Sequence, residues 1–182
     1  EVTVIGEIDK IFSEIHDLEA QIEQVSAEIE AGSSGAAQME KLDRLHLAYE
    51  QKGGYTYKSE ITGILHSMAF TSEFYNKKIG SLSGGERTRL ALAALLLEKP
   101  DLLLLDEPFS ALDYQTRLSV CDDISSIIRS RKKTAILITH DLSEAVSAAD
   151  RILVLTSRPG RIKGELLIRF PDHETSPLKR RN

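Results

Sequence analysis

Two adjacent carboxylates end an apolar run, and this arrangement suits chemistry on a phosphate group. Asp106 and Glu107 directly follow residues 102–105, which are all leucine. In α/β proteins, ligands bind at the carboxyl ends of the strands. We expect Asp106 to hold Mg²⁺, which prefers oxygen ligands, and Glu107 to act as the base for an attacking water. The alternative is that both are solvated acids that only end a strand.

A histidine follows a second apolar run in the same way. His140 stands shortly after residues 135–138, again at the expected carboxyl end of a strand. Because parallel strands end at one edge of a sheet, we expect His140 beside Asp106 and Glu107. A neutral imidazole there can donate to a phosphate oxygen and hold the attacking water. Taken alone, such a histidine is more often structural, and the neighbouring acids favour the catalytic interpretation.

Two glycines at the start of a helix offer a seat for a phosphate. Ser83, Gly84, Gly85 and Glu86 open an apolar helical segment that runs to about Glu98. Unobstructed backbone N–H groups at the glycines and the positive end of the helix dipole favour an anion there. Ser83 and Glu86 also have the spacing of a capping box, which needs no ligand. An ordinary helix start is therefore the alternative.

The second part of the chain alternates between short apolar strands and helical segments. This alternation predicts an α/β fold with a parallel, doubly wound sheet. The expected strands are 102–106, 134–139, 151–155 and 164–169, and the expected helices among them are 114–129 and 142–148.

The first part of the chain has the pattern of a helical hairpin. Apolar residues from Ile8 to Ile29 recur at alternating steps of three and four, a heptad seam typical of one long helix. A second helix is expected over 36–51, with Met39, Leu42, Leu45 and Tyr49 on one face, and a short third one over 59–68. The seam either packs the arm against itself or binds a partner.

Charge is distributed unevenly along the 182 residues. Residues 1–60 carry 13 acidic and 5 basic side chains, a net charge of −8, and residues 61–182 carry 15 acidic and 18 basic ones, a net charge of +3. Direct contact between the acidic arm and RNA is therefore disfavoured. The single cysteine, Cys121, excludes an internal disulfide framework. With no long apolar run and no signal-peptide pattern, a cytoplasmic protein is expected.

Four segments together resemble the motifs of ABC-type ATPases. Residues 82–86 resemble the signature, 102–108 the Walker B motif, 110–113 the D-loop, and His140 the switch histidine. The resemblance implies a P-loop NTPase-like parallel sheet, ATP as the substrate, Mg²⁺ as the cofactor and a site shared with a second ABC ATPase domain. By the same resemblance, residues 83–86 close over the phosphates of the partner domain. Asp113 belongs to the loop that communicates between two nucleotide sites.

The resemblance has two parts. Residues 1–108 resemble an ABC-F protein, a ribosome-associated translation ATPase, and residues 109–170 resemble the ATPase subunit of a nitrate, sulfonate or taurine importer. We therefore hypothesise a recombination or an engineered fusion within the Walker B motif. The partners implied are a ribosome or a membrane transporter subunit, and the importer-like part implies a location peripheral to the membrane.

The resemblance also implies a division into domains. Residues 1–52 are expected to form the helical-hairpin arm, and 53–98 an all-helical subdomain with the signature. Residues 99–170 are the expected C-terminal part of the ATPase core, and 171–182 a basic flexible tail.

The phosphate loop that such an ATPase needs is missing from the sequence. No Gly-Lys pair occurs, so the pattern G-x-x-x-x-G-K-[ST] is absent. We expect that the chain starts downstream of this loop and of the first strand, that it hydrolyses ATP poorly alone, and that a P-loop-bearing half restores activity. Open strand edges also predict self-association. The alternatives are a non-catalytic interaction module and an inert chimeric fragment.

Overall fold

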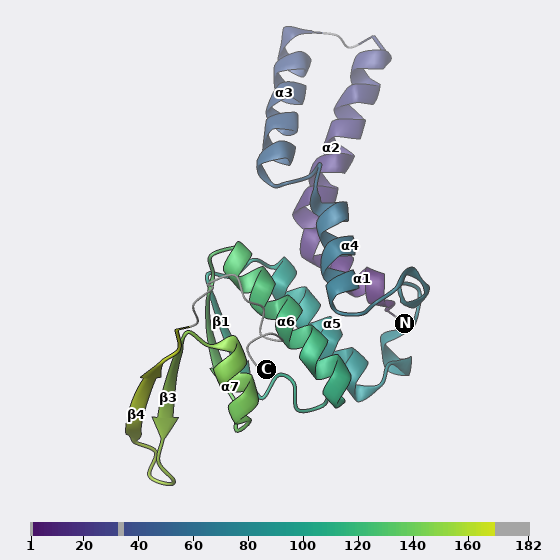
Figure 1. Cartoon of the computed structure of the whole chain (residues 1–182). Coiled ribbons are helices and arrows are strands. Elements are labelled where there is room, and N and C mark those ends of the chain that lie inside the picture. The colour runs from purple at the N-terminus through teal and green to yellow at the C-terminus, as the bar shows by residue number, and fades with distance from the viewer. Residues whose placement is uncertain (1, 33–34, 170–182) are drawn as a thin grey trace. The chain divides into compact units, whose positions relative to one another are not determined.

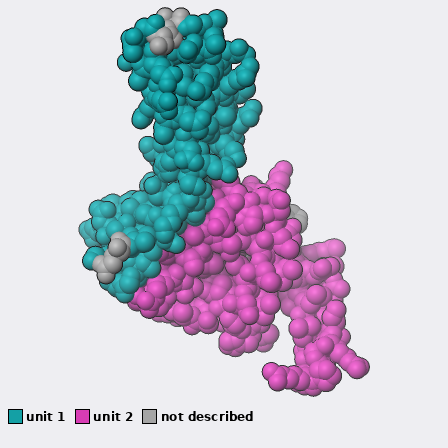
Figure 2. Space-filling view, turned by 180° about the vertical axis from the view of Figure 1, so that it is seen from behind, with its two compact units in different colours: residues 1–66, 70–81 teal, residues 67–69, 82–182 magenta. Residues whose placement is uncertain are grey.

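The structure is a computed structural model that describes residues 2–32 and 35–169. The predicted basic tail, 171–182, lies outside the described residues. The chain divides into two compact units, which Figure 2 distinguishes by colour. One unit comprises residues 1–66 and 70–81, and the other comprises residues 67–69 and 82–182.

The first unit is helical, and its longest helices form the predicted hairpin. α2 (Ser13–Glu30) and α3 (Ala36–Gln51) run side by side in opposite directions (Figure 1). The remaining elements of this unit are α1 (Val4–Asp9), η1 (Lys10–Phe12), α4 (Tyr57–Ser67), η2 (Ser72–Phe74) and η3 (Ile79–Ser81).

The long first helix that the heptad seam predicts is interrupted, so that prediction was wrong in one respect. A 3₁₀ turn, η1, separates α1 from α2. Phe12 at the end of this turn is buried, and its ring centroid lies 5.3 Å from that of Tyr57. The turn thus coincides with an aromatic contact that the apolar spacing does not encode.

Most of the core of the first unit comes from the seam and from α4. Val4, Ile8, Ile15 and Val25 are buried on the seam side, and the buried residues of α4 are Tyr57, Ile61, Ile64 and Leu65. α3 contributes no buried residue. Met39, expected on its packed face, is 52% exposed, which corrects the prediction for that residue.

The second unit contains the predicted parallel strands. β1 (Leu102–Asp106) pairs in parallel with β2 (Thr134–Ile138), with Leu104 opposite Ile136. The helices are α5 (Gly84–Leu97), α6 (Tyr114–Ser130) and α7 (Leu142–Ala148), and α5 and α6 run next to each other beside β1 (Figure 1). This arrangement confirms the predicted α/β class with a parallel sheet.

The last two strands do not join that sheet. β3 (Arg151–Leu155) pairs antiparallel with β4 (Ile162–Leu167) in a sheet of its own, so the prediction that 151–155 extends the parallel sheet was wrong. A short connection joins these strands, and short connections favour antiparallel pairing. Thr156 holds it together, since its backbone N–H donates to Arg161 O at 2.9 Å and its Oγ1 donates to Pro159 O at 3.0 Å.

One face of the parallel pair is open. Leu103 and Leu105 are 3% and 7% exposed, whereas Leu102, Leu104, Ile136 and Ile138, which the register places on the other face, are 49–63% exposed. No further strand pairs with β1 or β2 within residues 2–32 and 35–169. Among the helices described there, none is both long and apolar enough to cross a membrane.

Candidate functional site

The carboxyl ends of β1 and β2 bring Glu107 and His140 into direct contact, as the sequence predicts for parallel strands. The Nδ1 atom of His140 lies 2.6 Å from Oε1 of Glu107. The backbone N–H of His140 donates to the same oxygen at 3.0 Å. Because both contacts use Oε1, Oε2 is the oxygen of Glu107 left to accept a proton from a water.

The backbone of Glu107 adopts an uncommon conformation. Its φ angle is +46°, in the left-handed region that side chains other than glycine rarely enter. Its N–H donates to Ile138 O at 2.9 Å, and its carbonyl accepts from the N–H and the hydroxyl of Ser110 at 3.2 and 2.9 Å. Such conformations cost about 1–3 kcal/mol and cluster at functional sites. The backbone at Glu107 is therefore strained at the residue whose carboxylate contacts His140.

The charge of Glu107 acts on the imidazole of His140. The hydrogen bond that Glu107 accepts, and then the negative charge of Glu107, raise the pKa of His140, and the charges of Asp141 and Glu144 add to this effect. The share of protonated imidazole at neutral pH therefore exceeds that of an ordinary histidine, although the sequence interpretation used the neutral form. The His140 side chain is 85% exposed. Since Nδ1 is engaged, Nε2 is the ring nitrogen that can meet a phosphate oxygen.

Asp106 is the last residue of β1, opposite Ile138 in the register. Its side chain is exposed and makes no hydrogen bond or ion pair with the described residues. Those residues also include no group of three or more side chains suited to holding a metal. Mg²⁺ in phosphate-transfer sites commonly uses one or two carboxylates and takes its other ligands from water and phosphate. The chemistry of Asp106 fits that role.

The start of α5 forms the capping box that the sequence predicts. Oγ of Ser83 accepts from the N–H of Glu86 at 3.2 Å, and Oε2 of Glu86 accepts from the N–H of Ser83 at 2.6 Å. Both side chains are thus engaged by the helix itself. The N–H groups of Gly84 and Gly85 find no acceptor among the described residues. The capping box is confirmed, and the phosphate seat stays a prediction.

Gly85 also lies against the loop that precedes α6. A Cβ atom at Gly85 would stand 3.2 Å from Ala111 O and 3.3 Å from Cδ2 of Leu112. The glycine therefore permits a close approach between the α5 start and this loop. Asp113 at the end of the loop caps α6, since its Oδ1 accepts from Thr116 N at 3.0 Å. Hydrogen bonding with the side chain of Thr116, and then with its backbone, lowers the pKa of Asp113.

Sequence reasoning missed two charged residues near the site, Arg117 and Glu144. Glu144 is only 3% exposed, although it is a carboxylate, and the guanidinium of Arg117 lies 3.6 Å from its Oε1. Arg117 also donates to Leu112 O at 3.2 Å. The one local signal was the spacing from Asp141, which caps α7, to Glu144 three residues later. No local pattern pairs Glu144 with an arginine on another helix.

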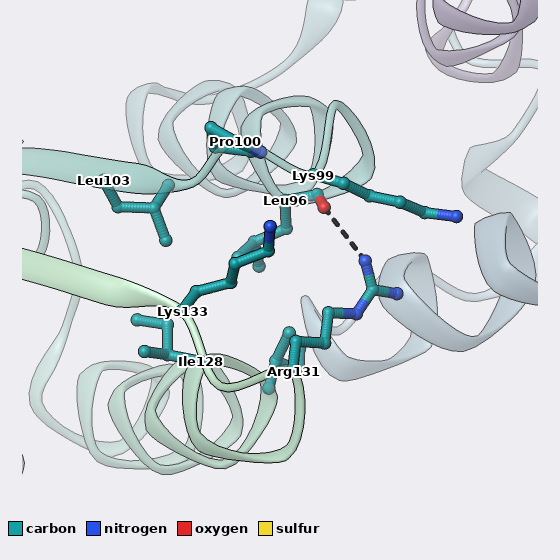
Figure 3. Close-up of a pocket in the computed structure, with 8 residues that line it drawn as sticks. Leu96, Lys99, Pro100, Leu103, Ile128, Arg131 and Lys133 are labelled. Carbon is teal, nitrogen blue, oxygen red and sulfur yellow. Dashed lines mark hydrogen bonds between the residues drawn. The ribbon is translucent and has the colours of Figure 1, made fainter.

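A small cavity lies near the other end of β1 and does not belong to this site (Figure 3). It has a volume of about 10 Å³ and is lined by Leu96, Pro100, Leu103, Ile128 and Arg131, among others. Arg131 closes one side by donating to Leu96 O at 3.2 Å. A volume of this size holds one water at most. The cavity is a small packing gap between α5, β1 and α6.

Comparison with known proteins identifies the family. The profile described as ABC transporter matches residues 5–110, which is more than half of the chain. The chain belongs to the ABC transporter family. It is 48% identical over 99 residues to the aliphatic sulfonates import ATP-binding protein SsuB of Bacillus licheniformis, which covers 53% of this chain and 39% of that protein. It is 39% identical over 125 residues to the nitrate import ATP-binding protein NrtD of Synechocystis, covering 69% of this chain and 44% of that protein.

Solved structures of ABC proteins share the fold. The dimeric ATP-binding cassette MJ0796, in a post-hydrolysis state with ADP and Pi, matches with a TM-score of 0.54 and 27% identity over 66% of this chain and 49% of that chain. The RNase-L inhibitor matches with a TM-score of 0.53 and 34% identity over 62% of this chain and 22% of that chain. The present chain thus spans less than half of each of these relatives.

Proposed function

We propose that this chain is part of an ATP-hydrolysing ABC domain, with Asp106, Glu107 and His140 as its reaction edge. The observation that carries the proposal is the contact of 2.6 Å between His140 Nδ1 and Glu107 Oε1, directly after the strand that ends in Asp106. Membership of the ABC transporter family supports ATP as the substrate and Mg²⁺ as the cofactor.

In the proposed reaction, a water attacks the γ-phosphorus of ATP. A bond forms between the water oxygen and phosphorus, the bond to the bridging oxygen breaks, and ADP leaves. Glu107 accepts the proton of the water at Oε2 while His140 holds Oε1. The Nε2–H of His140 donates to a γ-phosphate oxygen. When bound, Mg²⁺ would be held by Asp106 and would neutralise charge on the phosphates.

We further propose that a P-loop-bearing half from outside these 182 residues covers the open sheet face. The sequence contains no Gly-Lys pair, so it offers no lysine of the phosphate-loop type. Parallel sheets are normally covered on both faces. The open face of Leu102, Leu104, Ile136 and Ile138 is an apolar surface of the kind that such a half would bury. Without that half, the same surface favours self-association.

The helix start at Ser83, Gly84, Gly85 and Glu86 and the loop ending in Asp113 are proposed to face a second ABC ATPase domain. The contact between Gly85 and Ala111–Leu112 supports this, because it makes one continuous surface of the two segments. The dimeric form of MJ0796 supports a partner of the same family.

Import across a membrane is the process that we propose for the ATPase. SsuB and NrtD, to which the chain is similar, are import ATP-binding proteins. This proposal makes a membrane transporter subunit the further partner and places the protein at the cytoplasmic side of the membrane.

A role on the ribosome is the second candidate. The helical hairpin of α2 and α3, with the resemblance of residues 1–108 to ABC-F proteins, supports it. A further structural neighbour is an archaeal ribosome recycling factor in complex with a ribosomal stalk protein, with a TM-score of 0.53 and 34% identity. Co-sedimentation of the chain with ribosomes, compared with retention by transporter-containing vesicles, separates the two candidates.

The domain division remains part of the proposal. It consists of an arm at 1–52, a helical subdomain at 53–98, a partial core at 99–170 and a tail at 171–182. We also propose that the two parent families meet within the Walker B motif, where a leucine-rich strand common to both tolerates a junction.

The test is ATP hydrolysis by the chain mixed with a separately expressed P-loop half of an importer ATPase. Glu107→Gln keeps the shape of the side chain and removes the base, so turnover should fall by 10²-fold or more, as for loss of a general base. Glu165→Gln is the matched control, because Glu165 lies on β4 and pairs with Arg151 at 3.6 Å. Equal turnover in both variants contradicts the assignment. No turnover in any mixture favours a non-catalytic module or an inert chimeric fragment.

A further inference from the structure

We propose that Arg117 is a positioning residue that couples the loop 109–113 to the turn carrying His140. This inference rests on the proposed function. The guanidinium contacts the two segments at once, although neither segment was expected to involve it. It lies on the first turn of α6, with 26% of its side chain exposed.

On one side, Arg117 holds the loop. Its Nη2 donates to Leu112 O at 3.2 Å, and its backbone N–H donates to Asp113 O at 2.8 Å. Leu112 is 6% exposed, and its Cδ2 is one of the two atoms closest to the missing Cβ of Gly85. The carbonyl that Arg117 binds therefore belongs to the residue that meets the start of α5.

On the other side, Arg117 holds the segment around His140. Its Nη1 lies 3.6 Å from Oδ2 of Asp141 and 3.6 Å from Oε1 of Glu144. The other oxygen of Glu144 accepts from the hydroxyl of Thr139 at 2.7 Å, and that hydroxyl accepts from Asp141 N at 3.0 Å. Thr139 and Asp141 flank His140, so the arginine and the buried carboxylate hold both of its neighbours.

The chemistry of the contact requires an arginine. A buried carboxylate such as Glu144 is costly without a cation beside it. A lysine could supply that charge, but it is a single point charge on a flexible stem. The planar guanidinium presents separate nitrogens to Leu112 and to the carboxylates at the same time. A partner domain that shifts the loop 109–113 would therefore shift the His140 turn through this side chain.

The first experiment uses the full chain alone and reads the backbone amide resonances of Leu112 and His140 by NMR. In Arg117→Gln both resonances should move. In Arg117→Lys the His140 resonance should shift less than the Leu112 resonance. Lysine keeps the positive charge beside the carboxylates but lacks the second guanidinium nitrogen that binds Leu112 O. Arg129→Gln is the matched control, since Arg129 is also on α6, is 30% exposed and pairs with Asp150 at 3.3 Å. There, neither resonance should move.

A second variant protects the test against unfolding. Arg117→Gln leaves Glu144 buried without its cation, whereas Arg117→Gln with Glu144→Gln removes both charges and is milder. The double variant should keep the fold, and the resonances of Leu112 and His140 should both still move, because the arginine that contacts both segments is gone. An Arg117→Gln variant or a double variant that folds, and in which the Leu112 resonance moves while the His140 resonance does not, would overturn the proposal.

The second experiment measures ATP hydrolysis by the variants mixed with the P-loop half. Arg117→Gln should lower kcat by on the order of 10-fold to 100-fold and leave KM for ATP within about twofold, because it disturbs position rather than binding. Unchanged kcat would overturn the coupling role. If the unaltered mixture shows no turnover, the proposed function fails, while the NMR result still decides whether Arg117 couples the two segments.

Discussion

The hairpin arm and the parallel sheet differ in how far their apolar residues are buried and in whether their acidic side chains have hydrogen-bond partners. In the first unit, the seam residues Ile8, Ile15 and Val25 of the arm are buried. The carboxylate of Glu19 on α2 accepts from the hydroxyls of Tyr49 on α3 and Tyr57 on α4 at 2.7 and 3.3 Å. In the sheet, one apolar face lies open, and Asp106 at its edge bonds to nothing within the described residues.

The difference shows where the molecule is complete in itself. These seam residues are buried within the first unit, to whose core α4 also contributes, whereas a parallel pair of strands needs cover on both faces. The first unit therefore covers its own apolar seam. The sheet carries reactive groups at its edge and an apolar surface beside them, which is the arrangement expected of a part that works against another protein segment.

The largest expected effect comes from charging the open face. Leu104→Lys with Ile136→Lys should weaken docking of a P-loop half by roughly 3–6 kcal/mol, since burial of each large aliphatic side chain contributes about 1.5–3 kcal/mol. Sedimentation velocity should also show less self-association. The control is Leu47→Lys in the arm, because Leu47 is similarly exposed at 56%. If Leu47→Lys has the same effect, the contrast between the two regions is wrong.

The next effect concerns the buried seam of the arm. Ile8→Ala should lower the free energy of unfolding by about 2–5 kcal/mol, because Ile8 is fully buried and the substitution leaves a cavity. Leu104→Ala on the open sheet face should cost less than about 1 kcal/mol, because its side chain is 63% exposed. Urea unfolding of the two variants measures the difference. A larger cost for Leu104→Ala would reverse the comparison.

A smaller effect is expected in the polar cluster of the arm. The hydrogen bond from Tyr49 lowers the pKa of Glu19, and the pKa of Tyr49 is raised to about 12, chiefly by its burial. Tyr49→Phe should cost about 1 kcal/mol at pH 7, where Glu19 is ionised.

The pH dependence of that cost has a definite sign. The pKa of Glu19 is lower in the folded protein than in the unfolded chain. The stability that this difference gives is present above the unfolded pKa of about 4.3 and is lost as pH falls through the folded pKa. In urea unfolding, the cost of Tyr49→Phe should therefore shrink as the pH is lowered from about 5 through the folded pKa of Glu19. Tyr55→Phe, at a hydroxyl only 3.4 Å from His46 and 67% exposed, is the control and should show no such trend.

The smallest effect is expected at the sheet edge, where His140 is mostly exposed. Glu107→Gln removes the group that raises the pKa of His140, so that pKa should fall toward the ordinary value of about 6.5. The stabilisation from the pair of Glu107 and His140 is present below the unfolded pKa of His140 and is lost as pH rises through its folded pKa. An NMR titration of the His140 imidazole measures the change. If His140 had the same pKa in Glu107→Gln as in the unaltered protein, the electrostatic effect of Glu107 on His140 would be contradicted.

Local signals predicted much of the molecule. The periodicity of α3 and α6, the capping box at Ser83 and Glu86, and the strand that ends in Asp106 all follow from residue types at short spacings. The contact of Glu107 with His140 was also predictable, because parallel strands end at one edge.

The remaining features depend on contacts between segments far apart in the sequence. The antiparallel pairing of β3 with β4 depends on which strands are available as neighbours, and the apolar run at 151–155 suits either sheet. The left-handed backbone of Glu107 is set by Ile138, 31 positions further on, as well as by Ser110. The pairing of Arg117 with Glu144 joins two helices, and no spacing rule encodes it.

Equilibrium binding of Mg-ATP tests the central claim most directly. The chain is titrated with a fluorescent ATP analogue in the presence of Mg²⁺, first alone and then with a P-loop half of an importer ATPase. The account predicts negligible affinity for the chain alone and binding that appears only in the mixture, because the phosphate loop supplies most of the contacts to the phosphates. Micromolar binding by the chain alone, unaffected by Asp106→Asn and Glu107→Gln, would contradict it.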